Sequence, residues 1–296
     1  MLLNKQTLQA WILAIRPRTL PAAASGVLMG CALAWRDGFF RIGAALACLF
    51  AALLLQIGSN LANDVFDFER GTDTPDRLGP TRVTQAGLLT PSQVKLGMGV
   101  VFALSALLGF YLAWLGGWPI ILIGIAAIIS AIAYTGGPFP LGYYGLGDIF
   151  VFIFFGVAAV AGTYYVQAGF VSTAAWWMVL PPGLIITAIL VVNNLRDIEN
   201  DRKGKKHTLA VMFGEGFAKT EYLICMLAAY LVLPLAAWLG IIPWLSLLAW
   251  GSLPFAFRAT RTVFTRKGRP LNAALAGTGQ TAFVFSVLFW VGLLLR

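Results

Sequence analysis

Long apolar segments separated by short polar breaks are the feature that most restricts what this chain can fold into. A helix that crosses a membrane needs about 20 apolar residues in succession. Charged residues make up only 11% of the 296 residues, against roughly a quarter in a soluble domain, so most of the surface must face lipid. We expect an all-α integral membrane protein with about nine transmembrane helices in one bundle, formed by a single domain, 1–296. The predicted spans are 19–35, 42–59, 94–115, 118–135, 147–167, 174–192, 220–239, 241–257 and 273–295.

The basic residues lie on one side of this predicted bundle. Of the 21 Lys and Arg residues, 18 fall before the first span or within 60–95, 193–219 and 258–269. Because cytoplasmic segments carry the excess of Lys and Arg, this bias predicts a cytoplasmic N-terminus and a multi-pass protein of the inner, cytoplasmic membrane. Membrane topology therefore explains the net charge of +9, and we expect no nucleic-acid partner. The opening residues, up to Arg18, are interpreted as an interfacial segment before an uncleaved first span.

Acidic side chains are concentrated in two loops on the same predicted side. The loops at about 60–93 and 193–219 hold nine of the 12 Asp and Glu residues. A shift of 133 residues superimposes one loop on the other. The aligned pairs are Asn60 and Asn193, Asp64 and Asp197, Asp67 and Asn200, Arg70 and Lys203, and Gly71 and Gly204. Since both loops follow spans that run in the same direction, we expect a parallel repeat with a pseudo-twofold axis, which would bring both acidic segments to one central cavity.

Each acidic loop begins with polar side chains that would share one face if the preceding helix continued. These side chains are Asn60, Asp64 and Asp67 in the first loop, and Asn193, Asp197 and Asp201 in the second. Repulsion among such carboxylates is relieved by Mg²⁺, which combines a few carboxylates with waters and substrate phosphates. Basic residues lie between the acids and supply charge-assisted hydrogen bonds to phosphate. The pattern therefore predicts metal-assisted diphosphate chemistry at the membrane surface.

These motifs resemble the two aspartate-rich motifs of the UbiA superfamily of intramembrane aromatic prenyltransferases, and the resemblance covers nearly the whole chain. Longer strings are similar to the branch that prenylates 1,4-dihydroxy-2-naphthoate in menaquinone biosynthesis. The strings are 16–23, 79–87, 134–143, 145–148 and 193–197. One departure is Gly71, where the first motif of the family often has a further Asp. Asp73 is the candidate to take that part.

The resemblance implies transfer of a prenyl group from a polyprenyl diphosphate to 1,4-dihydroxy-2-naphthoate, with loss of the carboxylate and a demethylmenaquinol-type product. It implies Mg²⁺ held by four residues that are also the catalytic ones: Asp64, Asp67, Asp197 and Asp201. The diphosphate would be bound by Asn60, Arg82, Arg202 and Lys205. The acceptor would be steered, or the allylic cation stabilised, by Arg16, Tyr134 and Tyr143. The isoprenoid tail would lie among membrane lipid, where its CH₂ groups avoid water.

Two other functions stay open at this point. The same aspartate motifs suit prenyl transfer to 4-hydroxybenzoate or homogentisate, and both phytyl and polyprenyl donors fit them. The alternative from another class is a membrane transporter, since many transporters are repeats of several spans. Transporters usually place ionisable groups near the bilayer midplane, however, and the predicted spans lack midplane acids, with Asp148 near an inner end. Prenyl transfer is therefore the favoured prediction.

Overall fold

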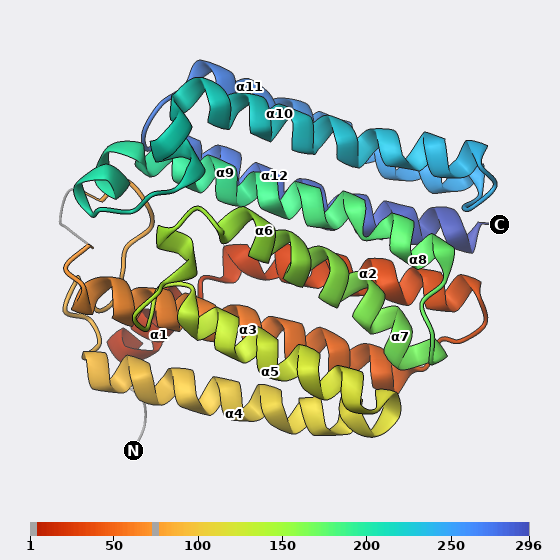
Figure 1. Ribbon diagram of the computed structural model, residues 1–296, viewed down its shortest axis with the longest axis horizontal. Coiled ribbons are helices and arrows are strands. Elements are labelled where there is room, and N and C mark those ends of the chain that lie inside the picture. The colour runs from red at the N-terminus through yellow and green to blue at the C-terminus, as the bar shows by residue number, and fades with distance from the viewer. Residues whose placement is uncertain (1–4, 73–76, 296) are drawn as a thin grey trace.

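Most of the helices run side by side along one long axis and form a bundle (Figure 1). The computed structural model describes residues 5–72 and 77–295, and every regular element in those ranges is helical. The first half contains α1 (Lys5–Ile15), η1 (Pro17–Thr19), α2 (Leu20–Arg36), α3 (Ile42–Glu69), α4 (Pro91–Gly116) and α5 (Trp118–Ala133). The second half contains η2 (Leu141–Tyr143), α6 (Gly147–Phe152), η3 (Ile153–Gly162), α7 (Thr163–Ala168), α8 (Thr173–Met178), α9 (Leu180–Lys203), α10 (Leu209–Trp238), η4 (Trp244–Ser252), α11 (Leu253–Thr265) and α12 (Leu271–Leu294).

All nine predicted spans correspond to helical structure in these ranges, so the all-α bundle expected from the apolar segments is confirmed. Within 5–72 and 77–295, six helices are long and apolar enough to cross a membrane, and α5 is a shorter apolar helix. The outer faces carry large exposed apolar side chains, among them Leu107, Trp114 and Phe257. Such a surface is stable only against lipid or another apolar partner.

The middle of the bundle is held together by the close approach of α2 to η3, a π-helical segment that links α6 to α7. A Cβ at Gly26 would lie 2.6 Å from the backbone oxygen of Phe155, and one at Gly30 would lie 2.5 Å from that of Val160. Small residues at four-residue spacing allow helix backbones to pack this closely in a membrane bundle. The same contact places the π-helical segment, and its phenylalanines, beside the centre of the bundle.

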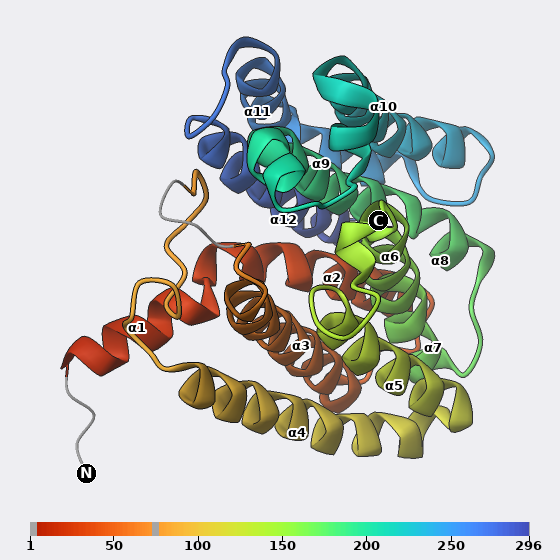
Figure 2. The ribbon, with the colours of Figure 1, turned by 60° about the vertical axis from the view of Figure 1, so that its left-hand side comes forward.

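The helices α3 and α9 continue past the apolar spans and carry both acidic motifs as helix. At a rise of about 1.5 Å per residue, a helix of 28 residues such as α3 is roughly 42 Å long, which exceeds a hydrocarbon core of about 30 Å. Both helices end at the side of the molecule where the long loops lie, and Figure 2 brings that side forward. The first ends at Glu69 and the second at Lys203, only one residue away from the shift of 133. Both helices therefore continue about ten residues beyond the predicted spans 42–59 and 174–192, into the segments expected as loops.

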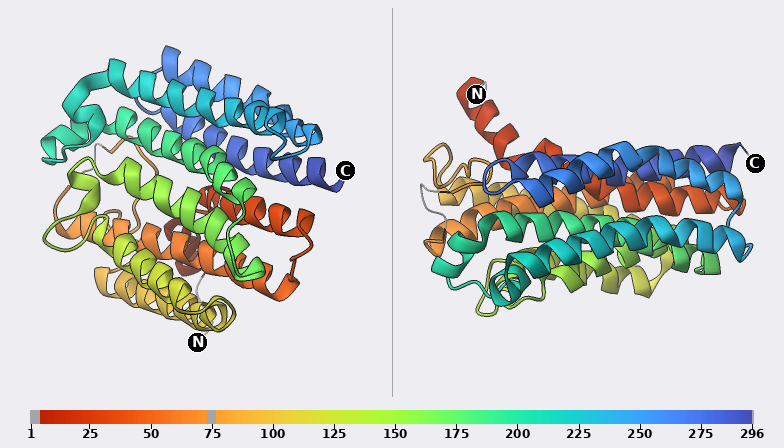
Figure 3. Two further views of the ribbon diagram at one scale, coloured as in Figure 1. Left: turned by 45° about the vertical axis from the view of Figure 1, so that its right-hand side comes forward. Right: turned by 90° about the horizontal axis from the view of Figure 1, so that it is seen from above.

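The first helix, α1, projects from the bundle at the same end, as the right-hand view of Figure 3 shows. Its side chains Leu8, Ile12 and Leu13 are about half exposed. An apolar face on a helix that leaves the bundle at a membrane surface suits the lipid headgroup region.

Candidate active site

A large cavity occupies the centre of the bundle and has two chemically different regions. Its volume is about 1060 Å³. Charged side chains at the ends of α3 and α9, and in the loops that follow them, line one region. The other region is lined mainly by apolar side chains of α4, α5, α6 and η3. The charged residues in the lining are Arg16, Arg18, Asp67, Arg77, Arg82, Arg196, Asp197, Asp201 and Lys206.

Asp67, in the last turn of α3, is the centre of the charged region on that side. Its side chain is only 2% exposed. The Oδ2 atom accepts a hydrogen bond from Arg82 Nη2 at 3.0 Å, and Oδ1 accepts from Lys206 Nζ at 3.2 Å and from the Tyr143 hydroxyl at 2.9 Å. Two cations and a phenol therefore donate to one carboxylate. The same cations can also donate hydrogen bonds to an anionic ligand in the cavity.

Tyr143 brings the loop between α5 and α6 to the same place. Its hydroxyl also contacts Thr72 Oγ1 at 3.0 Å, and Lys206 Nζ lies 4.6 Å from the centre of its ring. Burial, and then the negative charge of Asp67, raise the pKa of the Tyr143 phenol above its ordinary value. The phenol therefore stays protonated at neutral pH and donates to Asp67.

The end of α9 holds its carboxylates differently. Asp197 accepts two hydrogen bonds from the guanidinium of its neighbour Arg196, one of them from Nε at 2.8 Å. Arg196 is buried and also donates to Asn193 at 2.8 Å and to Asn272 at 2.6 Å. Asp201, one turn further along, lines the cavity, and its carboxylate makes no hydrogen bond or ion pair with the described part of the chain. Asp201 is thus the carboxylate whose oxygens are most available to a ligand.

Two residues predicted to bind metal or diphosphate point away from the cavity. Both oxygens of Asp64 accept backbone hydrogen bonds at 3.0 Å, from Val83 and from Thr84. Asn60 donates to the backbone oxygen of Ile15 at 2.9 Å and to Thr19 at 3.0 Å. Neither residue lines the cavity. Asp64 therefore fixes the loop that carries Arg82, while Asn60 fixes the junction between α1 and α2.

The second loop presents a different lysine from the one predicted. Arg202 pairs with Glu199 on the surface, and Lys205 is exposed; neither lines the cavity. Lys205 adopts a left-handed backbone conformation with a φ of 55°, which turns the chain between α9 and α10. The next residue, Lys206, then points inward to Asp67. Sequence reasoning missed Lys206 because four basic residues in close succession differ only in the direction that this turn gives them.

The predicted acceptor-side residues all lie at the cavity. Arg16 lines it from the junction after α1, where its φ of 54° also places it in the left-handed region. Tyr134 lines it from the end of α5, and its ring is held between two glycines. A Cβ at Gly142 would lie 2.9 Å from that ring, and one at Gly147 would lie 2.8 Å from its hydroxyl. Asp73, the other candidate metal ligand, lies outside the described residues.

Comparison with known proteins gives the family. The model of the UbiA prenyltransferase family matches residues 23–287. The chain belongs to the UbiA prenyltransferase family. It is 39% identical to the 1,4-dihydroxy-2-naphthoate octaprenyltransferase of Escherichia coli K12, with 97% of this chain and 96% of the relative covered. It is 40% identical to the enzyme of the same name from Mycobacterium tuberculosis, with 94% of each chain covered.

Solved structures of the family share the fold at low sequence identity. An apo UbiA homologue from Aeropyrum pernix matches with a TM-score of 0.69 and 15% identity, over 95% of this chain and 97% of that one. A homologue from Archaeoglobus fulgidus, bound to GPP and Mg²⁺, matches with a TM-score of 0.66 and 15% identity, over 96% of this chain and 99% of that one. The bundle of this UbiA-family chain is thus the family fold.

The residues at the charged end of the cavity suit a divalent cation that is shared with a ligand. Within 5–72 and 77–295, no three acidic, histidine or cysteine side chains are grouped closely enough to hold a metal ion by themselves. Three carboxylates nevertheless line this end, from Asp67, Asp197 and Asp201. Mg²⁺ commonly takes one or two carboxylates, several waters and substrate phosphate oxygens. The donor set therefore fits a magnesium ion whose shell is completed by a bound diphosphate.

Proposed function

We propose that this chain transfers a prenyl group from a polyprenyl diphosphate to 1,4-dihydroxy-2-naphthoate, with loss of the carboxylate, giving a demethylmenaquinol-type product. The main support is the identity of 39–40%, over nearly the full length, to relatives named for this reaction. The cavity also supports this reaction, because acidic and basic side chains line one end and apolar side chains line the rest. A diphosphate with a long hydrocarbon tail has the same two-part character.

The diphosphate belongs at the charged end. Asp67, Asp197 and Asp201 would hold Mg²⁺ there, and the ion would neutralise part of the diphosphate charge. Arg82 and Lys206 already lie within 3.2 Å of Asp67, so they can turn their N–H donors to phosphate oxygens with little movement. Each such charge-assisted bond strengthens as negative charge builds up on the leaving oxygen.

Departure of the diphosphate starts the reaction. The allylic carbon–oxygen bond breaks and the diphosphate leaves with the electron pair, so that positive charge develops on the prenyl carbon. Tyr134 and the phenylalanines of α6 and η3 line the cavity and can face that charge with their rings. A ring carbon of the naphthoate attacks the cation, and the carboxylate leaves as carbon dioxide. The electrons of the broken carbon–carbon bond restore the aromatic ring, so no separate base is needed.

The tail belongs in the apolar region, which reaches the outer surface beside α4 and α5. Phe110 and Ile125 line the cavity and are 73% and 52% exposed. Each CH₂ of a tail kept from water there stabilises the complex by about 0.8 kcal/mol. Gly124 also lines the cavity, with open space around it. Gly124→Leu should therefore impair use of an octaprenyl donor while geranyl diphosphate still reacts; equal loss with both donors would place the tail elsewhere.

The charged end of the cavity would face the cytoplasm, as the excess of Lys and Arg on that side indicates. The three cysteines of the chain are buried, so an added surface cysteine can report on orientation. Lys205→Cys, at the exposed turn after α9, should react with a membrane-impermeant maleimide only in inverted membrane vesicles. Labelling in intact cells would show that the charged end faces the outside.

Product formation tests the proposed reaction. Purified protein in nanodiscs would receive radiolabelled octaprenyl diphosphate and Mg²⁺, with 1,4-dihydroxy-2-naphthoate and 4-hydroxybenzoate offered separately. The expected result is a labelled naphthoquinol, lost on chelation of the metal and in Asp201→Asn. Product from 4-hydroxybenzoate alone would keep prenyl transfer and change the acceptor. Absence of product with every aromatic acceptor, in folded protein, would overturn the proposal.

A further inference from the structure

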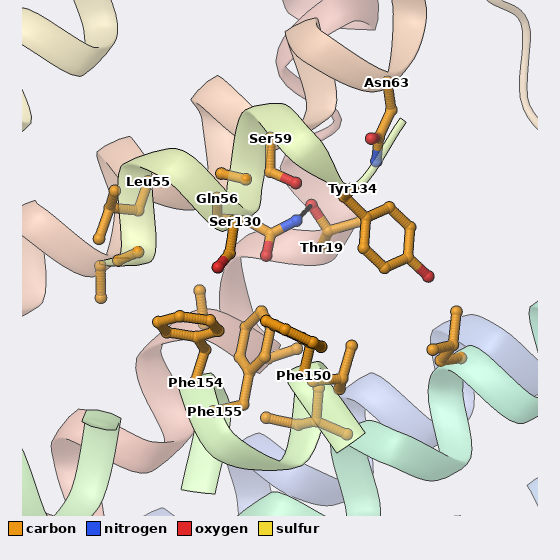
Figure 4. Close-up of a pocket in the computed structure, with 18 of the residues that line it drawn as sticks. Thr19, Leu55, Gln56, Ser59, Asn63, Ser130, Tyr134, Phe150, Phe154 and Phe155 are labelled. Carbon is orange, nitrogen blue, oxygen red and sulfur yellow. Dashed lines mark hydrogen bonds between the residues drawn. The ribbon is translucent and has the colours of Figure 1, made fainter. Parts of the chain in front are cut away.

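Polar side chains continue into the cavity well beyond the charged end. On α3, the cavity-lining residues with hydroxyl, amide or carboxylate side chains are Gln56, Ser59, Asn63 and Asp67. Ser59 precedes Asp67 by eight residues, which corresponds to about 12 Å along the helix axis. On α5, Ser130 lines the cavity one turn before Tyr134. Figure 4 shows Gln56, Ser59 and Ser130 together on one side of the pocket. We refer to these three residues as the polar stripe.

The hydroxyl groups of the polar stripe lack the hydrogen bonds that several other helix hydroxyls of this protein make. A Ser or Thr buried in a helix commonly donates to the carbonyl four residues earlier. Thr187 donates to Gly183 at 2.9 Å, and Ser286 donates to Ala282 at 3.0 Å. The hydroxyl groups of Ser59 and Ser130 make no hydrogen bond to any described residue. Their hydroxyls are therefore free to bind a ligand in the cavity.

A chain of hydrogen bonds fixes the direction of the Gln56 amide. The backbone oxygen of Ile15 can only accept, so the Asn60 group that meets it at 2.9 Å must be the NH₂. The Asn60 oxygen then accepts from Gln56 Nε2 at 3.2 Å. With its NH₂ occupied, Gln56 presents Oε1 as an acceptor that no described residue uses, and Figure 4 shows this oxygen turned toward Ser130. Asn60 thus has a positioning role that its aspartate-motif pattern did not indicate.

Flat apolar side chains form the opposite wall. Figure 4 shows Phe150, Phe154 and Phe155 facing the polar stripe across the pocket. The rings of Phe150 and Phe154 are stacked, with centres 6.4 Å apart and planes inclined by 28°. A space with hydroxyl and amide groups on one side and flat rings on the other suits a flat aromatic ring that carries hydroxyl groups.

An isoprenoid tail does not account for the polar stripe. Its hydrocarbon groups neither donate nor accept hydrogen bonds, so two serine hydroxyls and an amide oxygen would stay unsatisfied beside it, at a cost for each group. The apolar residues of α4 and α5 offer the tail another route. Asn63 and Tyr134 line the cavity one helical turn beyond Ser59 and Ser130, so the stripe is continuous with the charged end.

We propose that Gln56, Ser59 and Ser130 bind the hydroxyl groups of the aromatic acceptor, while Phe150 and Phe154 pack against its ring. The proposal rests on the prenyl transfer proposed above and assigns the acceptor its own part of the cavity. It makes the polar stripe a determinant of acceptor specificity, separate from the residues that bind the diphosphate.

Steady-state kinetics with both substrates varied would test the assignment. Ser59→Ala and Ser130→Ala should each raise the KM for 1,4-dihydroxy-2-naphthoate about three- to tenfold, the effect of one lost hydrogen bond, and leave the KM for the prenyl diphosphate unchanged. Ser286→Ala is the matched control, because this buried hydroxyl lies outside the cavity lining and bonds to its own helix. It should change neither KM.

An acceptor with one hydroxyl removed adds a second readout. Wild-type protein should have a higher KM for 1-hydroxy-2-naphthoate than for the dihydroxy compound, and one of the serine variants should lose that difference in KM, because the partner of the missing hydroxyl is already gone. An unchanged acceptor KM in both variants, or a raised KM for the prenyl diphosphate, would overturn the proposal. Failure of the proposed function is distinct from this, since wild-type protein would then form no product from either naphthoate.

Discussion

The ends of α3 and α9 carry related sequences but neutralise their carboxylates in different ways. On α3, Asp64 is bound by two backbone N–H groups of the following loop, and Asp67 is held by Arg82 and Lys206. On α9, the residue equivalent to Asp64 is Asp197, which is bound by its neighbour Arg196. The position equivalent to Asp67 is an asparagine, and the second cavity carboxylate comes from Asp201.

This difference shows that a repeated motif need not have a repeated role. The end of α3 organises its surroundings: it anchors the loop after it and gathers two cations. The end of α9 leaves Asp201 available, and its own arginine ties it to α12 through Asn272. A diphosphate with its metal would thus contact cations mainly at the end of α3, and the available carboxylate of Asp201 at the end of α9. Substitutions at equivalent positions can separate these roles.

The cavity carboxylates should give the largest effects. Asp201→Asn and Asp67→Asn should each lower kcat/KM for prenyl transfer by about a hundredfold or more, as expected when a group that organises charge at the reacting bond is removed. Thermal unfolding in detergent should separate the two variants. Asp201→Asn should leave the melting temperature unchanged, whereas Asp67→Asn should lower it, because Arg82 and Lys206 lose their partner. Full activity in Asp201→Asn would contradict the account.

Asp64→Asn should act chiefly on stability. An asparagine offers only one oxygen, so one of the two buried N–H groups of Val83 and Thr84 loses its acceptor, at a cost of about 1–3 kcal/mol. The expected result is a lower melting temperature, with Mg²⁺ dependence of the remaining activity unchanged. A shift of the Mg²⁺ requirement to higher concentration, with normal stability, would instead make Asp64 a metal ligand.

Neighbouring lysines allow a matched comparison. Lys206→Gln removes a charge-assisted bond at the cavity and should raise the KM for the prenyl diphosphate about tenfold. Lys205→Gln makes the same change at an exposed side chain one residue earlier and should leave that KM unchanged. Equal effects of the two substitutions would show that the turn after α9 does not decide which of the two lysines binds the diphosphate.

Tyr143→Phe should give the smallest effect. Loss of one hydrogen bond to Asp67 should lower the free energy of unfolding by about 0.5–1.5 kcal/mol. Burial and the charge of Asp67 raise the pKa of this phenol, so it stays protonated and the bond persists through mildly alkaline pH. Activity profiles of the wild type and the variant should therefore run parallel from about pH 7 to 9. Profiles that converge as the pH rises would mean that the phenol loses its proton in that range.

Much of the fold follows from the sequence because apolar segments of membrane length can satisfy their backbone only as helices. The spacing of the polar side chains in the acidic motifs suits a helix, and both motifs do continue helices. Side-chain directions were harder to predict: Asn60 and Asp64 lie on the same helix as Asp67 but meet other parts of the chain. The loop that folds back on Asp64, and the left-handed turn at Lys205, have no periodic signal. Long-range packing alone decides which neighbouring polar side chains enter the cavity.

The central claim is that both helix ends serve one site for a metal-bound diphosphate. Binding of Mn²⁺, in place of Mg²⁺, can be followed by electron paramagnetic resonance in the presence of geranyl diphosphate and without any acceptor. The account predicts protein-bound Mn²⁺ in the wild type, and its loss in both Asp67→Asn and Asp201→Asn. Retention of wild-type Mn²⁺ and diphosphate affinity when either helix end is neutralised would contradict a shared site.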